Sequence, residues 1–256
     1  MSREDIRIKI IATDIDGTLT IDRNRYEILP EVVSRIQMLG YLGIKTVLVS
    51  ANALPVALGL ARYIGAKGVV AENGCMIAVM NHVEGRNVVI QQLCDWPSFI
   101  TLKEISGVLQ GFANESWQND YRKCDFAFIP IDKNKALDGL KALEKHLAQK
   151  GYDKYISAGF SGYAIHVHPI HCSKLAGLKK ILELMNSSLD EVLAIGDSVM
   201  DVDIVKHAKI GVAVSNADDE LKNVAKYVTK HPSGFGFIEA IDHIVLMRYK
   251  DAKQSQ

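Results

Sequence analysis

The sequence predicts an α/β fold in which a parallel sheet is interrupted by an inserted α+β unit. Short apolar runs alternate with helical patterns at the start of the chain, and this alternation returns at its end. Between the two parts it becomes less regular. Regular alternation produces right-handed crossovers and a parallel sheet. We therefore expect a Rossmann-like core from residues 1–82 and 171–256, with residues 83–170 inserted as a cap.

Each element of the first part has its own pattern. Residues 8–15 are a short β-rich apolar run, typical of a parallel strand buried on both faces. Residues 29–43 carry apolar side chains at helical spacing, with Pro30 near the start and Gly43 near the end. The remaining predicted elements are strands over 44–52 and 68–74 and a helix over 53–65.

The middle and the end of the chain differ in their strand patterns. In the insert, residues 135–151 form a clear amphipathic helix, and the other runs favour an antiparallel sheet. There we predict strands within 82–93, 124–130 and 163–170, and a helix over 96–112. For the last part we predict strands over 191–198 and 210–216, and helices over 173–186, 201–208, 217–228 and 233–247.

Composition narrows the class of protein. The chain has 256 residues, 48% of them hydrophobic, with 30 basic and 30 acidic side chains, which argues against a dedicated nucleic-acid binder. No apolar run is long enough to span a membrane, and the N-terminus has no signal-peptide pattern, so we expect a cytoplasmic protein without a membrane partner. The four cysteines are scattered without a CxxC pair and are expected to be free thiols: Cys75, Cys94, Cys124 and Cys172.

Polar side chains follow three of the predicted core strands. Asp14 and Asp16 follow the first strand, and side chains two residues apart on a strand share a face. Ser50, with Asn52 nearby, follows the second, and the third ends in "IGDSVMD". Ligands of open parallel sheets bind at the carboxyl ends of the strands. These groups are therefore expected to meet.

The gathered side chains suit a hard cation. Asp197 and Asp201 of the third strand end add two carboxylates to the first pair, and carboxylate oxygens suit Mg²⁺ rather than zinc. Gly17 permits a tight turn whose N–H can approach an anion. Lys174 is available to neutralise a phosphate.

The order of four motifs resembles the haloacid-dehalogenase superfamily of phosphohydrolases. The motifs are "DIDGTLT", "VLVSAN", "SKLAGLKKIL" and "IGDSVMDVDI". The insert lies between the second and the third, as in the Cof-like, type IIB branch. Within it, "YAIHVHPI" and "AVSNADDELKNVAKYVT" look most like the archaeal phosphoglycolate phosphatases.

The resemblance implies a role for each matched residue. Asp14 would be the nucleophile that forms an aspartyl phosphate, and Asp16 the general acid and then the base. Mg²⁺ would be held by Asp14, the backbone carbonyl of Asp16, Asp197 and Asp201. The phosphoryl oxygens would be bound by Ser50, Lys174, Gly17 and Asn52. The implied reaction is hydrolysis of a small phosphomonoester, with 2-phosphoglycolate as the best guess.

Several alternatives remain open at this point. Other substrates are sugar phosphates or phosphoglycerates; the chain could also be a phosphotransferase or mutase, or a phosphate-binding module without activity. Met200 and Leu175 depart from the usual Asn and Gly of the motifs.

His166 and His168 share a strand face but are expected to be polar cap residues rather than zinc ligands. His166, Ser157 and Ser161 are candidate substrate contacts, and the protein is expected to be a monomer or a homodimer.

Overall fold

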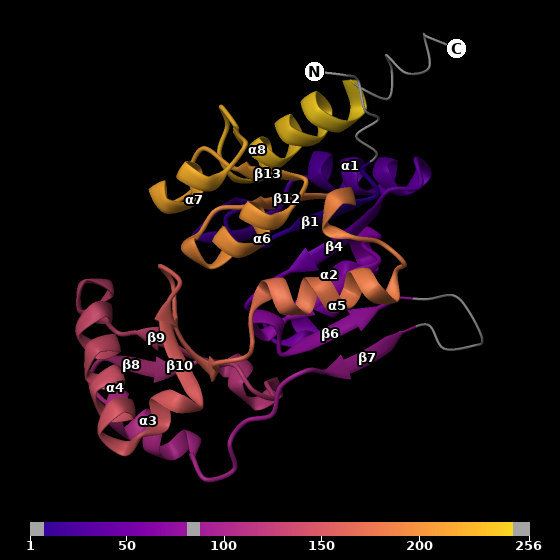
Figure 1. Cartoon of the computed structure of the whole chain (residues 1–256). Coiled ribbons are helices and arrows are strands. Elements are labelled where there is room, and N and C mark those ends of the chain that lie inside the picture. The colour runs from indigo at the N-terminus through magenta and orange to yellow at the C-terminus, as the bar shows by residue number, and fades with distance from the viewer. Residues whose placement is uncertain (1–7, 81–87, 248–256) are drawn as a thin grey trace.

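Two β-sheets organise the chain. The computed structural model describes residues 8–80 and 88–247. Figure 1 shows a larger sheet with helices on both faces, and below it a smaller sheet backed by its own helices. The predicted α/β fold class is thus confirmed.

The larger sheet has the strand order β14-β13-β12-β1-β4-β5-β6-β7. Its first six strands in that order are parallel, and β6 and β7 are antiparallel to their neighbours. The strands are β1 (Ile10–Thr13), β4 (Lys45–Val49), β5 (Gly68–Ala71), β6 (Met76–Val79), β7 (Val89–Gln92), β12 (Val192–Gly196), β13 (Ile210–Ala213) and β14 (Tyr227–Val228). Because β1 lies between β12 and β4, three chain segments far apart in sequence end side by side.

Helices cover both faces of this sheet. Helix α2 ends at Gly65, whose φ of 90° is the left-handed conformation that favours glycine. The helices of this part are α1 (Pro30–Tyr41), α2 (Leu54–Ile64), α5 (Lys174–Leu184), α6 (Val202–His207), α7 (Asp219–Val224) and α8 (Ser233–Ala240). The helix predicted over 233–247 ends earlier than expected, because its second half, Ile241–Leu246, is a π-helical segment.

The smaller sheet is antiparallel, as predicted, with the order β10-β11-β9-β8. Its strands are β8 (Ala113–Glu115), β9 (Phe126–Pro130), β10 (Ile156–Phe160) and β11 (Ile165–Pro169), and its helices are α3 (Leu102–Leu109) and α4 (Ala136–Lys150). Each of these two sheets, together with its helices, is called the larger or the smaller unit. Each unit has its own apolar cluster, and Trp96 packs against both clusters. The helix predicted over 96–112 begins only after Thr101, whose side chain accepts a hydrogen bond from the Glu104 N–H and caps it.

The structure covers the predicted division between core and cap only in part, and it contains a hairpin that the sequence did not predict. The predicted boundary at residue 83 lies outside the described residues, so the division into core and cap stays a prediction. Strand β7 lies beyond that boundary but pairs with β6 in the larger sheet. The hairpin of β2 (Thr20–Asp22) and β3 (Arg25–Ile28) was not predicted, because its three- and four-residue strands are too short to show a period.

The expectation of four free thiols is wrong for this structure. Cys75 is disulfide-bonded to Cys124, and Cys94 to Cys172. The sequence could not show this, since the partners are 49 and 78 residues apart.

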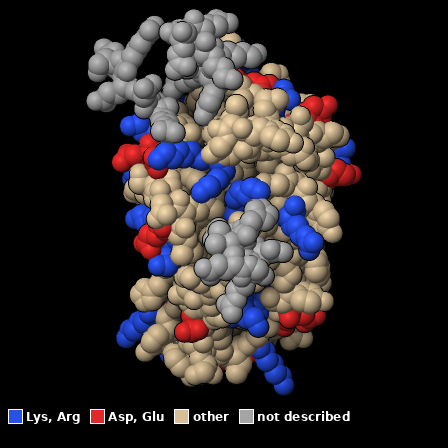
Figure 2. All heavy atoms as spheres, turned by 90° about the vertical axis from the view of Figure 1, so that its right-hand side faces the viewer, with Lys and Arg blue, Asp and Glu red and all other residues tan. Residues whose placement is uncertain are grey.

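Surface features bear on the expected partners. Figure 2 shows both signs of charge distributed over one face of the molecule, in keeping with the balanced composition. Within residues 8–80 and 88–247, no helix combines the length and the apolar character that crossing a membrane requires.

Candidate active site

The carboxyl ends of three adjacent strands form the floor of the site. Asp14 directly follows β1, Ser50 follows β4 and Asp197 follows β12. The register places Thr13 beside Leu48 on one side and Ile195 on the other, so the residues that follow are brought together. The structure therefore gathers these three side chains where the sequence predicted a common edge.

Lys174 joins two of the carboxylates. Its Nζ donates to Asp14 Oδ1 at 2.8 Å and to Asp201 Oδ1 at 2.7 Å, and all three side chains are buried. Lys174 is the first residue of α5, and the Ser173 hydroxyl caps that helix by accepting from the Ala176 N–H at 3.1 Å. Capping fixes the first turn and so fixes where the ammonium group points. Leu175 packs against the apolar core beside it and leaves Lys174 in the site.

Burial and like charge shift the pKa values of these groups. Burial raises the pKa of Asp14 well above its ordinary value, and the neighbouring carboxylates add to this although Lys174 opposes it. Burial and the charge of Asp201 raise the pKa of Asp197 to about 6. Burial opposes the charge of Lys174, but Asp14 and Asp201 outweigh it, so its pKa lies above the ordinary value. The site thus holds more negative charge than one lysine neutralises.

Three of these carboxylates are placed to share one cation. Oxygens of Asp14, Asp197 and Asp201 all lie within 4.8 Å of one another. Asp201 is held by its Oδ2, which accepts from the N–H groups of Asp197 at 3.2 Å and Ser198 at 3.1 Å, so Met200 does not displace it. A compact set of carboxylate oxygens fits Mg²⁺. The carboxylate of Asp16 lies outside this group, in keeping with a contribution through its backbone carbonyl.

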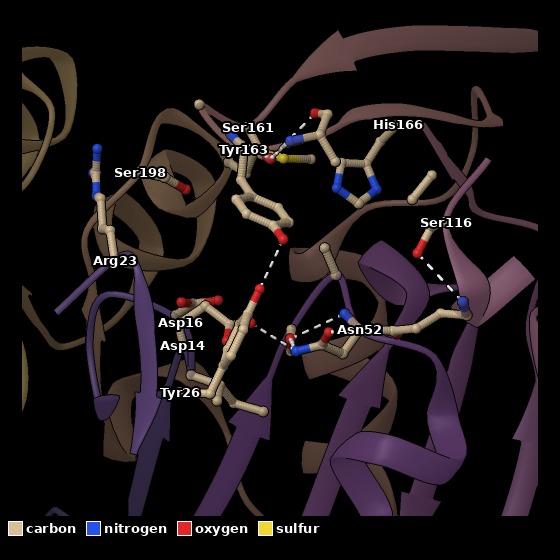
Figure 3. A pocket seen from close by; sticks show the side chains of 18 of the residues that line it. Asp14, Asp16, Arg23, Tyr26, Asn52, Ser116, Ser161, Tyr163, His166 and Ser198 are labelled. Atoms are coloured by element: carbon tan, nitrogen blue, oxygen red, sulfur yellow. Dashed lines mark hydrogen bonds between the residues drawn. The ribbon is translucent and has the colours of Figure 1, made fainter. Parts of the chain in front are cut away.

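Asp16 is positioned by a relay of hydrogen bonds that reaches the smaller unit. Asn52 Nδ2 donates to Asp16 Oδ2 at 2.6 Å and to Ser50 Oγ at 3.2 Å. The side-chain oxygen of Asn52, Oδ1, in turn accepts from Gln118 Nε2 at 2.8 Å. Burial raises the pKa of Asp16, although the bond from Asn52 opposes this. Figure 3 shows Asn52 pointing at Asp16 from the neighbouring strand end.

Gly17 sits in a turn that only glycine fits. Its φ is +85°, and a Cβ built there would collide with the Asp197 carboxylate and with Arg23. Its N–H donates to Thr20 Oγ1 at 2.8 Å. The Gly17 N–H was predicted to bind a phosphoryl oxygen, but in this structure it donates to a side chain within the turn.

Arg23 contacts the carboxylate cluster although no sequence motif predicts it there. It lies between β2 and β3, and its guanidinium donates to the carboxylate and backbone carbonyl of Asp197 and, at 3.1 Å, to Asp218. The Asn216 amide also reaches the site, donating to the Gly17 carbonyl at 3.1 Å. No sequence signal marks Arg23, since one arginine in a polar hairpin is typical of exposed turns.

A cavity of about 590 Å³ lies above the strand ends and is lined from both units. Ser161 and His166 line it, whereas Ser157 does not. Its wall also includes Tyr26, Trp117, Gln118, Arg122, Tyr163 and Met200. The Tyr26 hydroxyl donates to the Tyr163 hydroxyl at 2.8 Å, which links the β2–β3 hairpin to the smaller unit across the cavity (Figure 3).

A buried ion network supports the cavity wall in the smaller unit. Asp125 is fully buried, and its Oδ2 lies 3.0 Å from both His166 Nδ1 and Arg122 Nη1. Burial opposes ionisation of Asp125, but His166 and Arg122 outweigh it and hold its pKa below the ordinary value. His168 instead contacts the Pro169 carbonyl. In the described part of the chain, the side-chain groups arranged to hold a metal include no histidine.

Comparison with known proteins gives consistent matches. A profile of the haloacid dehalogenase-like hydrolases matches residues 11–98 and 112–241. Phosphoglycolate phosphatase 1 of Saccharolobus solfataricus is 36% identical over 93% of this chain and 96% of its own, and a phosphoglycolate phosphatase of Pyrobaculum islandicum is 37% identical over 94% and 97%. A solved Thermoplasma acidophilum structure superimposes with a TM-score of 0.75 at 23% identity, covering 93% of this chain and 98% of its own.

Proposed function

Since the chain belongs to the haloacid dehalogenase-like hydrolases, we propose that it is a Mg²⁺-dependent phosphomonoesterase that acts on a small phosphorylated metabolite. The observation that carries this proposal is the buried cluster in which Lys174 binds Asp14 and Asp201, with Asp197 within 4.8 Å. So many buried carboxylates around one lysine destabilise the folded protein unless a cation or protons neutralise them.

The donor set fits Mg²⁺, with Asp14, Asp197, Asp201 and the backbone carbonyl of Asp16 as its ligands. Bound there, Mg²⁺ supplies positive charge that lets an anionic nucleophile approach an anionic phosphate. Arg23 contacts the same Asp197 carboxylate, so its guanidinium lies at the edge of the site.

Asp14 is the proposed nucleophile. Its Oδ1 is bound by Lys174, which leaves Oδ2 to attack phosphorus. A bond forms between Oδ2 and phosphorus while the ester P–O bond breaks, and the leaving alkoxide takes a proton from Asp16. Water then attacks phosphorus as Asp16 takes its proton, and the bond to Asp14 breaks. Two moderate barriers replace one high barrier.

Asp16 is suited to carry that proton. Its raised pKa favours the protonated form needed for the first step, and general acid–base help is worth roughly 100- to 10,000-fold. Asn52 fixes its direction through the bond to Oδ2. Ser50 and the protonated Lys174 would bind phosphoryl oxygens as the charge on phosphorus moves.

The best substrate candidate is 2-phosphoglycolate, because the curated relatives named above carry that activity in their names. The cavity wall offers donors suited to a carboxylate next to the ester. Ser161, Gln118 and Arg122 are among the residues that line it. Sugar phosphates and phosphoglycerates remain rival substrates, and phosphoryl transfer to another metabolite remains a rival reaction.

A phosphate-release panel tests the proposal. We expect the full chain with Mg²⁺ to release phosphate from 2-phosphoglycolate faster than from phosphoglycerates, hexose phosphates or nucleotides. A preference for hexose phosphates would overturn the substrate assignment. A requirement for a bisphosphate activator with little free phosphate would identify a mutase.

Asp14→Asn tests the site itself. We expect this variant to lose phosphate release from every substrate, including a generic aryl phosphate. Asp190→Asn is the matched control, because Asp190 is exposed on the surface of the larger unit. Wild-type turnover in Asp14→Asn would refute the nucleophile assignment.

A further inference from the structure

The four cysteines form a cluster that takes no part in the proposed phosphate chemistry. Sulfur atoms of Cys75, Cys124 and Cys172 all lie within 4.8 Å of one another, and Cys94 is bonded to Cys172. These are all the cysteines of the chain. The cluster lies in the apolar core, with Cys75 and Cys124 fully buried and Cys172 3% exposed.

Backbone contacts, rather than the sulfurs alone, bring these four segments together. The turn before β6 holds Cys75, and the Leu93 N–H donates to the Cys75 carbonyl at 2.7 Å, which places Cys94 next to it. Glu72, in the same turn, accepts from the Cys124 N–H at 3.1 Å through its buried carboxylate. The cluster is therefore organised around one turn of the larger sheet.

The fourth segment is brought in by a close backbone approach. Gly74 has a φ of +100°, and any Cβ there would collide with the Ser173 carbonyl. Only glycine lets this turn lie directly against the segment that carries Cys172.

We propose that these four cysteines are a structural Zn²⁺ site, and that the two disulfides are its oxidised, metal-free form. Structural zinc sites take four ligands in a closed tetrahedron, and four thiolates are a common set. With Zn–S bonds of ~2.3 Å, the sulfurs of a tetrahedral site lie ~3.8 Å apart. The sulfurs of Cys75, Cys124 and Cys172 lie within 4.8 Å of one another, and reduction of the two disulfides lets each bonded pair open to the spacing of the site. A four-iron cluster would hold its cysteine sulfurs farther apart than a single ion does.

The change between the two forms is balanced. Reducing both disulfides takes four electrons and four protons, which two molecules of a dithiol supply as they close into their own disulfides. Zn²⁺ then displaces the four thiol protons as it binds the thiolates.

The position of the site indicates what zinc would do. Cys94 follows β7, where the chain leaves the larger sheet, and Cys172 precedes α5, where it returns. One ion would thus link the segments of Cys94 and Cys172 to the turn that carries Cys75. It would also link Cys124 of the smaller unit to that turn. Cys172 also lies two residues before Lys174, so the site fixes the segment that leads to the active-site lysine.

Metal and thiol analysis of the full chain tests this proposal. The protein is reduced with a dithiol, loaded with Zn²⁺ without air and desalted, and its metal content is then measured. We expect about one Zn²⁺ per chain, with four thiols that become reactive only after the protein is denatured and zinc is chelated. A reduced chain that retains no zinc, or that takes up iron in its place, would overturn the assignment.

Two variants locate the ion. Cys124→Ser should lose stoichiometric zinc, whereas Asp197→Asn, in the carboxylate site, should keep it. The reverse result would place the zinc at the aspartates and refute the proposal. If Cys124→Ser fails to fold, Co²⁺ titration of the reduced wild type decides. Thiolate-to-cobalt charge transfer with tetrahedral ligand-field bands supports the site, and their absence contradicts it.

Discussion

Replacing Lys174 with methionine should destabilise the protein strongly and in a way that depends on pH and Mg²⁺. The methionine side chain is similar in length to the alkyl chain of lysine and is also apolar, but it carries no charge. The substitution therefore removes two buried ion pairs without opening a large cavity. Asp14 and Asp201 then face each other without a counter-charge. Removing one partner of a buried ion pair typically costs about 3–5 kcal/mol of unfolding free energy.

The structure gives an independent estimate of that cost. The carboxylate oxygens of Asp14 and Asp201 lie within 4.8 Å of each other. At an effective dielectric constant of ~20, two unit charges at that separation repel by roughly 3.5 kcal/mol. The wild type carries the same repulsion, but there the two ion pairs of Lys174 offset it, and the variant loses that offset. The two estimates agree, and we expect a loss of about 3–5 kcal/mol near pH 7.5 without Mg²⁺.

Protonation should relieve the repulsion. When folding raises the pKa of a carboxyl group, the folded state binds the proton more tightly than the unfolded state does. The resulting stabilisation is complete at pH values below the pKa of the unfolded state. It is lost as the pH rises through the pKa of the folded state. The pKa of Asp14 is already raised in the wild type, and Lys174 is the group that opposes this rise. The loss in Lys174→Met should therefore be smaller at pH 5 than at pH 7.5, and Mg²⁺ should also reduce it.

Urea denaturation at pH 5 and pH 7.5, with and without Mg²⁺, measures these changes. Lys180→Met on the same helix is the matched control. Its salt bridge with Glu183 is also 2.8 Å long, but both side chains are largely exposed, so it should cost less than about 1 kcal/mol. Equal losses in the two variants, or no dependence on pH, would refute the account of a buried, over-charged site.

Three further predictions concern the neighbouring residues. Asn52→Ala should lower kcat about 10- to 100-fold, because Asp16 loses its positioning bond, and should move the high-pH limb of activity upward, because that bond lowers the pKa of Asp16; an unchanged pH profile would contradict the relay. Gly17→Ala should weaken Mg²⁺ binding by displacing Asp197, whereas Gly43→Ala, at a similar φ but with open space around its Cβ, should lower only the urea midpoint. Mg²⁺ affinity measured by calorimetry should fall as the pH drops below about 6, because Asp197 must be ionised to bind the ion; constant affinity from pH 5 to 8 would exclude Asp197 as a ligand.

The sequence predicted the parts of the site that depend on local order. Asp14, Ser50 and Asp197 each follow a buried apolar strand, and the rule that parallel strands end at one edge was enough to group them. The fold class followed from the same alternation. Lys174 could be placed because a helix start is a local pattern, here capped by Ser173.

Contacts between distant segments could not be predicted in this way. Arg23 reaches Asp197 across 174 positions of sequence, from a hairpin too short to show a period. Gln118 reaches Asn52 only because the smaller unit lies over the strand ends. The sequence pattern predicts separate thiols, because the convergence of the cysteines on one turn depends on backbone approaches such as that of Gly74. Each of these contacts depends on how distant segments pack in three dimensions. Neither the periodicity of apolar residues nor a sequence motif contains that information.

The central claim is that Asp14 carries the phosphoryl group between the two steps. Rapid acid quench of the wild-type protein with Mg²⁺ and 2-phosphoglycolate, followed by mass spectrometry of its peptides, measures this directly. We expect a phosphorylated peptide whose modified residue is Asp14, formed within the first turnover and absent in Asp14→Asn. Phosphate on another residue, or turnover with no phosphorylated enzyme at any time, would contradict it.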